Sequence, residues 1–207
     1  MRRIIIALIF IGTLLLSFTI SSKNLGNKKS EISGLTNSIE EKLLKQVTII
    51  KELVRTNPNY NNEIAFFVDM EIMSGKNRFF IYDLKKNKII DQGLVAQGFG
   101  SRIDPNGKLK FSNENNSLCT SLGKYSVGNS YHGQYGKAYK LHGLDATNNN
   151  ALVRNIVLHK NVKIPYEEQD KPIGYSFGCP MVNDIYYSRI EKLIDNSKRN
   201  IVLDIYY

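Results

Sequence analysis

Short β-type segments separated by turn-forming clusters fill the chain after residue 60, and this pattern constrains the fold more than any other feature. The segments combine β-branched and aromatic residues, and Gly, Asn, Asp and Pro gather between them, as at 74–77, 104–107 and 148–150. Such spacing is typical of a β domain. We therefore predict strands at 64–70, 78–83, 88–97, 123–127, 138–142, 155–159 and 201–207.

Two stretches show helical rather than β periodicity. In the first, Ser38 and Glu41 form a capping box, apolar residues recur at helical spacing up to residue 55, and Asn57-Pro58 ends the helix. In the second, residues 185–197 place their apolar side chains on one face, and Asn183 is the predicted N-cap. The sequence thus predicts a mainly β fold with few helices.

The N-terminus has the layout of an export signal. Arg2 and Arg3 precede an apolar run at 4–20, and this run is about as long as the shortest spanning helices. We therefore expect an exported protein of the periplasm or cell envelope, either cleaved or held at the inner membrane by residues 4–20. The predicted divisions are 1–22 as signal peptide or membrane anchor, 23–60 as linker and helix, and 61–207 as one β domain.

The net charge of the chain does little to decide which class of molecule it binds. The chain has 28 basic and 19 acidic residues, a formal net charge of +9. It has no run of about five like charges and no RNA-binding or zinc-finger signature, so we expect a solvated basic surface and no nucleic-acid partner. The 3 histidines and 2 cysteines lack the spacing of zinc ligands, and neither a metal nor another cofactor is expected. A monomer is expected.

Residues 175–180, Tyr-Ser-Phe-Gly-Cys-Pro, have the composition of a turn that presents a thiol nucleophile. Gly178 allows a tight turn beside Cys179, so that backbone amides can face a substrate carbonyl. A competing interpretation is a disulfide between Cys179 and Cys119, because export leads to an oxidising compartment.

A thiol nucleophile needs a base, and a histidine suits this role because its pKa lies near neutrality. His132 lies in a predicted loop among polar residues and is interpreted as a surface residue. His142 and His159 each end a predicted strand, where a side chain can be held rigidly at a cleft. Taken alone, either could instead be structural.

The spacing of these residues resembles that of the murein L,D-transpeptidase catalytic domain family. His159 ends a strand, sixteen residues intervene, and Ser176-Phe177-Gly178-Cys179 follows. The segment 121–127 is similar to a glycine-containing strand of that family. A strand ending in His-Gly, at 141–145, is similar to a subgroup in which such a strand precedes the catalytic histidine. The resemblance implies a β-sandwich or barrel catalytic domain over 61–207.

The resemblance also implies roles. Cys179 attacks, His159 takes its proton, the amides of Gly178 and Cys179 form the oxyanion hole, and Ser176 lines the site. His142 is the second candidate for the base. The expected substrate-contacting residues are His142, Gly143, Arg154 and Tyr125.

Two positions depart from the family pattern. Phe177 stands where many members have His or Lys, and Met181 stands where many have a polar Arg or Asn. The candidates to replace that polar residue are Arg154, Lys160 and Asn183.

The activity that the resemblance implies is acyl transfer on peptidoglycan stem peptides through a cysteine thioester. An incoming amine would give a cross-link, whereas water would make the protein an L,D-carboxypeptidase. A cell-wall-binding protein that keeps the fold without the chemistry is the alternative from another class.

Overall fold

The computed structural model describes residues 37–103 and 108–207. The predicted export signal and the apolar run at 4–20 lie outside these residues. Within them, no helix is long and apolar enough to cross a membrane.

The described chain forms one mixed sheet of nine strands with few helices, which confirms the predicted mainly β class. The strand order is β3-β2-β1-β9-β5-β6-β7-β8-β4, with β1–β9 and β7–β8 parallel and the other pairs antiparallel. The strands are β1 (Tyr60–Asp69), β2 (Phe79–Asp83), β3 (Lys88–Gly93), β4 (Val95–Ala96), β5 (Gly123–Gly133), β6 (Gly136–Gly143), β7 (Val157–Lys160), β8 (Met181–Val182) and β9 (Asn200–Tyr206).

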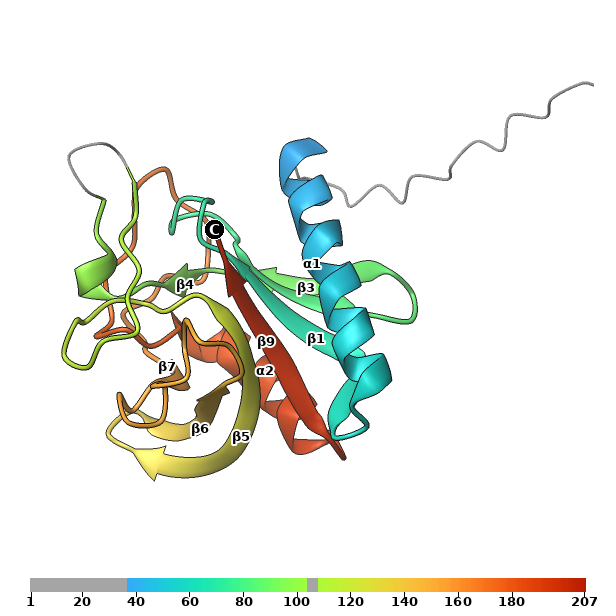
Figure 1. Ribbon diagram of the computed structural model, residues 1–207. Coiled ribbons are helices and arrows are strands. Elements are labelled where there is room, and N and C mark those ends of the chain that lie inside the picture. Colours follow the sequence, from blue (N-terminus) through green and yellow to red (C-terminus); the bar gives the residue numbers. More distant parts are fainter. Residues whose placement is uncertain (1–36, 104–107) are drawn as a thin grey trace, which may run out of the picture.

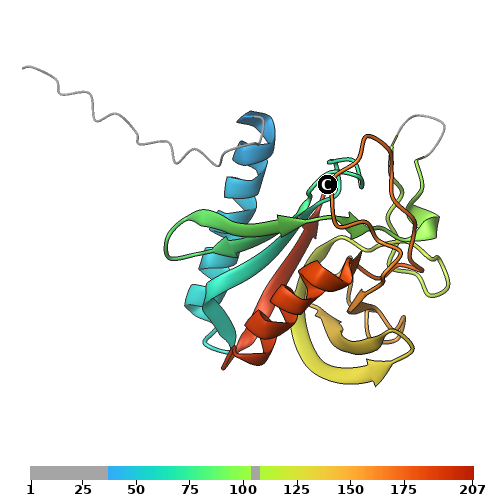
Figure 2. The ribbon, with the colours of Figure 1, turned by 180° about the vertical axis from the view of Figure 1, so that it is seen from behind.

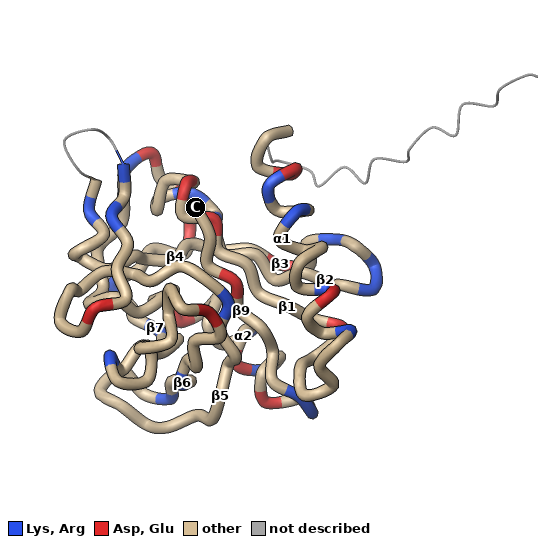
Figure 3. The backbone as a smooth tube through the Cα atoms, in the orientation of Figure 1, with Lys and Arg blue, Asp and Glu red and all other residues tan. Residues whose placement is uncertain are grey.

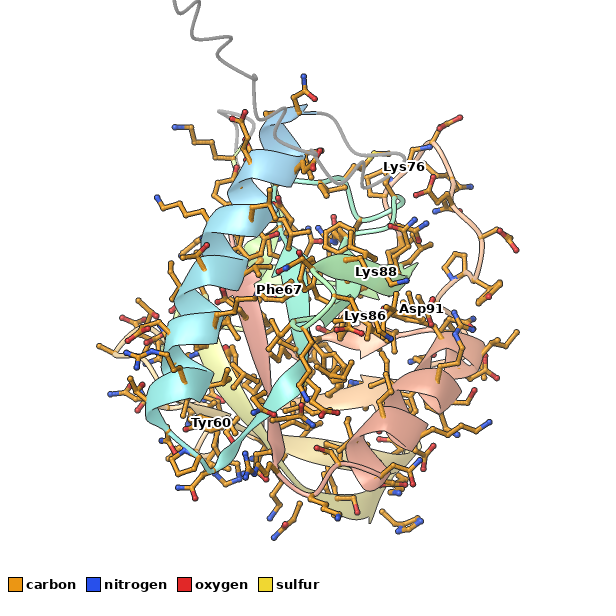
Figure 4. All side chains as sticks on the ribbon, turned by 90° about the vertical axis from the view of Figure 1, so that its right-hand side faces the viewer. Tyr60, Phe67, Lys76, Lys86, Lys88 and Asp91 are labelled. Carbon is orange, nitrogen blue, oxygen red and sulfur yellow. The ribbon has the colours of Figure 1, made fainter. Side chains whose placement is uncertain are left out.

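Two helices cover opposite faces of the sheet. α1 (Asn37–Thr56) lies across β1 and β9 on one face, and α2 (Asp184–Asp195) lies on the other, as the opposite views of Figures 1 and 2 show. Figure 4 shows strands between the two helices. A short 3-10 helix, η1 (Phe99–Ser101), follows β4.

The α1 face is an apolar layer. Leu43, Val47, Ile50 and Val54 recur at three- and four-residue spacing and pack on Phe67 of β1 and its neighbours. The helix ends at Thr56, before Asn57-Pro58, as predicted. Its start differs from the prediction, because Ser38 lies inside the helix and not before it.

On the other face, α2 packs Tyr186, Tyr187 and Ile190 against a second apolar layer, which includes Phe79 of β2 and Leu203 of β9. Asn183 caps this helix as predicted, since its side-chain oxygen accepts a hydrogen bond from the Ile185 N–H at 2.8 Å. The cap fixes where the chain turns from β8 into α2.

Two predictions need correction, and one strand was missed. The segment 88–97 divides at Leu94, because Gly93 lies against the Tyr186 ring and the chain then leaves β2 to pair β4 with β8. β5 continues to Gly133, so the exposed His132 lies in a strand opposite Lys137 and not in a loop. The two-residue strand β8 was not predicted, being too short to show a period. The remaining predicted strands form.

Basic residues are distributed over many elements, with acidic residues between them (Figure 3). This distribution agrees with a solvated surface better than with one basic stripe.

Candidate active site

A cavity of about 530 Å³ opens between the β5–β6 hairpin and the loops around β7 and β8. Cys179, His159, Ser176 and Arg154 all line it. The structure therefore brings four of the sequence-predicted site residues to one cavity.

The turn that carries Cys179 depends on Gly178, whose φ is +118°. A Cβ at this position would lie 2.9 Å from the Cys119 carbonyl oxygen, so both the conformation and the space favour glycine. Ser176 anchors the turn to η1, because its N–H donates to the Gln97 carbonyl at 2.9 Å and its carbonyl accepts from the Phe99 N–H at 2.8 Å.

The Ser176 hydroxyl closes this turn. It donates to the Cys179 carbonyl at 2.6 Å and accepts from the Gly178 N–H at 3.2 Å. The Gly178 amide is therefore engaged within the turn, which differs from its predicted place in an oxyanion hole. The Cys179 N–H has no hydrogen-bond acceptor among the described residues, so it is available to a ligand.

The Cys179 sulfur lies against the start of β7. The Val157 N–H donates to Sγ at 3.5 Å, and Sγ lies 3.7 Å from the Asn155 carbonyl oxygen. Val157 is two residues before His159, and side chains at this spacing share one face of a strand. The parallel ladder pairs His159 with Met181, two residues after the nucleophile candidate.

His159 is held from two sides. Its Nδ1 lies 3.0 Å from the Lys160 carbonyl oxygen, and the Tyr135 ring stacks on it with centroids 5.3 Å apart and an interplanar angle of 21°. A carbonyl only accepts, so Nδ1 carries the proton and Nε2 is the basic nitrogen. Burial lowers the pKa of His159, although the Lys160 carbonyl opposes the shift.

Burial has the opposite effect on the thiol. It raises the pKa of Cys179, while the Val157 N–H and the charge of Arg154 work against this rise. Near neutral pH, the Cys179 thiol and the His159 imidazole are therefore both uncharged.

Arg154 is fixed behind the nucleophile turn. Its guanidinium donates to the Ser112 carbonyl at 2.9 Å, the Ser121 hydroxyl at 3.0 Å, the Ser117 hydroxyl at 3.3 Å and the Cys119 carbonyl at 2.5 Å. Of the three polar candidates named to offset Met181, Arg154 is the one that lines the cavity. Asn183 instead caps α2.

Three predicted substrate-contacting residues lie away from the cavity. Tyr125 is fully buried, and its hydroxyl lies 2.7 Å from both the Ser121 carbonyl oxygen and the Ser121 hydroxyl. It thus supports the serine that holds Arg154. Gly143 packs on Asn148, where a Cβ would lie 1.9 Å from the carbonyl oxygen. His142 faces Gly128 across the β5–β6 pair and is not among the lining residues of the described cavity.

Cys119 and Cys179 are both free thiols. The Cys119 sulfur is directed towards Gly100, since it lies 2.8 Å from the position a Cβ would take there. The structure therefore contains two separate thiols and not the disulfide considered above.

Sequence reasoning missed the contribution of the β5–β6 hairpin. Tyr131 and Tyr135 reach the cavity from it, and Tyr135 covers the imidazole. The available signal was the sequence Gly-Gln-Tyr-Gly at 133–136, which is typical of a tight hairpin turn. No group of His, Cys, Asp or Glu suited to a metal ion occurs in the described ranges.

A family model for the L,D-transpeptidase catalytic domain matches residues 35–206. No curated protein sequence matches the chain. The structure is similar to an L,D-transpeptidase from Mycobacterium smegmatis, with 8% identity, a TM-score of 0.39, and coverage of 70% of this chain and 59% of that one. An L,D-transpeptidase from Xylanimonas cellulosilytica matches with 12% identity, a TM-score of 0.36, and coverage of 69% and 60%.

The helical cell shape determining protein Pgp2 from Campylobacter jejuni matches with 12% identity, a TM-score of 0.44, and coverage of 69% of this chain and 46% of that one. The chain therefore spans between 46% and 60% of the length of these three solved chains.

Proposed function

Because this chain belongs to the family of L,D-transpeptidase catalytic domains, we propose that it modifies peptidoglycan stem peptides by acyl transfer through Cys179. The single observation that carries the proposal is that Cys179 and His159 line one cavity on adjacent segments, with the basic Nε2 left free by the Nδ1 contact.

The proposed first half-reaction begins from the uncharged pair. His159 Nε2 accepts the Sγ proton as the sulfur attacks the carbonyl carbon of the bond that precedes the terminal D-residue of a tetrapeptide stem. The carbonyl oxygen becomes an oxyanion, for which the Cys179 N–H is the proposed donor. Collapse breaks the C–N bond, the imidazolium returns its proton to the leaving amine, and a thioester remains.

The second half-reaction repeats these steps with another nucleophile. An amine from a neighbouring stem loses its proton to His159, attacks the thioester and forms a new amide, while the sulfur leaves and regains a proton. Water in place of the amine gives a shortened stem, which is the carboxypeptidase outcome. We also propose that residues 1–22 direct export, because the substrate lies outside the cytoplasmic membrane.

The test is to incubate the purified full-length chain with disaccharide-tetrapeptide muropeptides and to follow the products by mass spectrometry beside Cys179→Ala. We expect loss of the terminal D-residue only with the cysteine present, and a cross-linked product if the chain is a transferase. We also expect the acid limb of kcat/KM to lie below about pH 6.5, because burial lowers the pKa of His159.

Cys119→Ala is the matched control, because it removes the other thiol of the chain. Equal products from native protein and Cys179→Ala would contradict the thioester route. Wall binding by both proteins without any product would support the non-catalytic alternative.

A further inference from the structure

Aromatic side chains surround the mouth of the cavity. Tyr131, Tyr135, Tyr175 and Phe177 all line it, and their exposed fractions are 38%, 49%, 41% and 78%. Isolated exposed apolar residues are ordinary, but several rings gathered around one cavity indicate a binding surface.

The rings on the nucleophile side form a supported platform. Phe99 of η1 meets Tyr175 edge to face, with centroids 5.9 Å apart and an interplanar angle of 88°. The Arg102 guanidinium lies 4.0 Å from the centroid of Phe99. These contacts hold Tyr175 and Phe99 in place, so this wall of the cavity is preorganised.

Phe177 differs from its neighbours because no other aromatic ring contacts it in the described part of the chain. Its backbone is fixed from both sides, by Ser176 and by the Gly178 turn. A ligand that covers this 78% exposed phenyl ring removes apolar surface from water, which favours binding.

The groups between the rings are neutral hydrogen-bonding groups for the most part. Gln134, Asn155 and Asn161 supply amides, and Arg154 and Lys163 supply cations. Flat apolar faces interleaved with amides complement a pyranose ring, which has C–H groups on its faces and hydroxyl or acetamido groups around its edge. A membrane surface fits less well, because these rings line a concave cavity.

The length of the stem is compatible with a sugar at this position. In a tetrapeptide stem, three residues separate the sugar from the reacting carbonyl, and at about 3.5 Å per residue they span roughly 10 Å when extended. Phe177 and Cys179 are two residues apart, so their Cα atoms are at most about 7 Å apart, and the ring reaches further.

We infer that the amino-sugar attached to the stem peptide stacks on Phe177, at the rim of the cavity that Tyr175 also lines, so that the protein selects stems that carry their glycan. This inference rests on the proposed function and names the substrate class of the same site. Phe177 thus acts as a specificity residue where many members of the family have His or Lys.

The test compares two substrates, a free tetrapeptide and the same tetrapeptide on its disaccharide, with native protein and Phe177→Ala. We expect native protein to show a KM about tenfold lower for the sugar-bearing substrate, and Phe177→Ala to lose most of this ratio. Phe177→Trp should keep it. Val162→Ala is the matched control, because Val162 is also 78% exposed and does not line the cavity.

The outcomes distinguish a failure of this inference from a failure of the proposed function. Cys179-dependent turnover with equal KM for both substrates would overturn the inference while leaving the proposed function intact. If neither substrate turns over, the proposed function fails, and calorimetric titration of Cys179→Ala with the free disaccharide tests the sugar site by itself. If Phe177→Ala keeps the substrate ratio but loses sedimentation with phosphatidylglycerol vesicles, the rim binds a membrane and the inference is wrong.

Discussion

Beneath α1, the described part of the sheet buries polar atoms that have no hydrogen-bond partner there, whereas around the cavity the buried polar groups hold one another in place. Asp69, Tyr82, Asp204 and Tyr206, together with Glu40 of α1, each have a buried oxygen with no hydrogen-bond partner among the described residues. Near the cavity, the hydroxyl of Ser176, the guanidinium of Arg154 and the hydroxyls of Ser121 and Tyr125 all make hydrogen bonds.

This difference suggests that the region under α1 stabilises the fold, whereas the hydrogen bonds around the cavity position its side chains. Under α1, apolar packing is extensive enough to tolerate unpaired oxygens, each of which costs free energy. At the cavity, the polar contacts run between loops that contribute little apolar area, so hydrogen bonds determine where the thiol and the imidazole lie. Substitutions in the two regions should therefore have separable effects on folding and on catalysis.

The largest expected effect is on catalysis. His159→Gln removes the proposed base, and kcat should fall by roughly 10² to 10⁴ while the free energy of unfolding changes little. Steady-state assay and urea unfolding measure the two quantities. His132→Gln is the control, because that exposed histidine lies on β5. Retained activity in His159→Gln, with activity lost in His142→Gln, would transfer the role of base to His142.

The next effect is on folding. Ile50→Ala removes a fully buried side chain of α1, so the free energy of unfolding should fall by about 2–5 kcal/mol, with kcat of the folded protein unchanged. Its neighbour Ile49 is 41% exposed, and Ile49→Ala should cost no more than about 0.5 kcal/mol. Similar losses for both variants would show that α1 does not pack on the sheet as described.

A third prediction uses pH. Burial raises the pKa of Asp204 to about 6, with Lys124 opposing and Asp145 reinforcing the rise. Its unfolded value is about 3.9, so its contribution to stability is fully present below about pH 4 and is lost as the pH rises through about 6. Asp204→Asn should therefore be more stable than native protein at pH 8, by on the order of 2 kcal/mol, and should match it at pH 4.

Urea unfolding at both pH values measures this difference. Asp170→Asn is the control, because that carboxylate is exposed and Lys76 lowers its pKa, so its loss should bring no gain at pH 8. No gain for Asp204→Asn at pH 8 would mean that the Asp204 carboxylate is not desolvated in the folded protein.

Much of the fold was predictable because it depends on local pattern. The helical spacing of Leu43, Val47 and Ile50 and the β-branched and aromatic strands appear directly in the sequence. The features that the sequence did not predict depend on residues far apart in the chain. The division at Leu94 depends on the Tyr186 ring almost a hundred residues away, and a two-residue strand such as β8 exists only because β4 and β7 flank it.

The candidate site shows the same contrast between local and non-local features. The spacing of His159, Ser176 and Cys179 predicted residues that do meet at one cavity. It could not predict that Tyr125 would be buried behind Arg154, or that a hairpin would place Tyr135 on the imidazole. Both depend on how the β5–β6 pair curves, which no local pattern determines.

The smallest effect concerns Asn183, for which the sequence allowed two roles, as a helix cap and as a polar group near the substrate. Its side chain accepts from the Ile185 N–H and donates to the Ile164 carbonyl at 2.7 Å, so both ends of the amide are engaged in the fold. Asn183→Ala should lower the free energy of unfolding by about 1 kcal/mol, and Asn183→Ser should restore part of it, with KM unchanged in both. Native stability combined with a raised KM in Asn183→Ala would instead place this residue among the groups that contact the substrate.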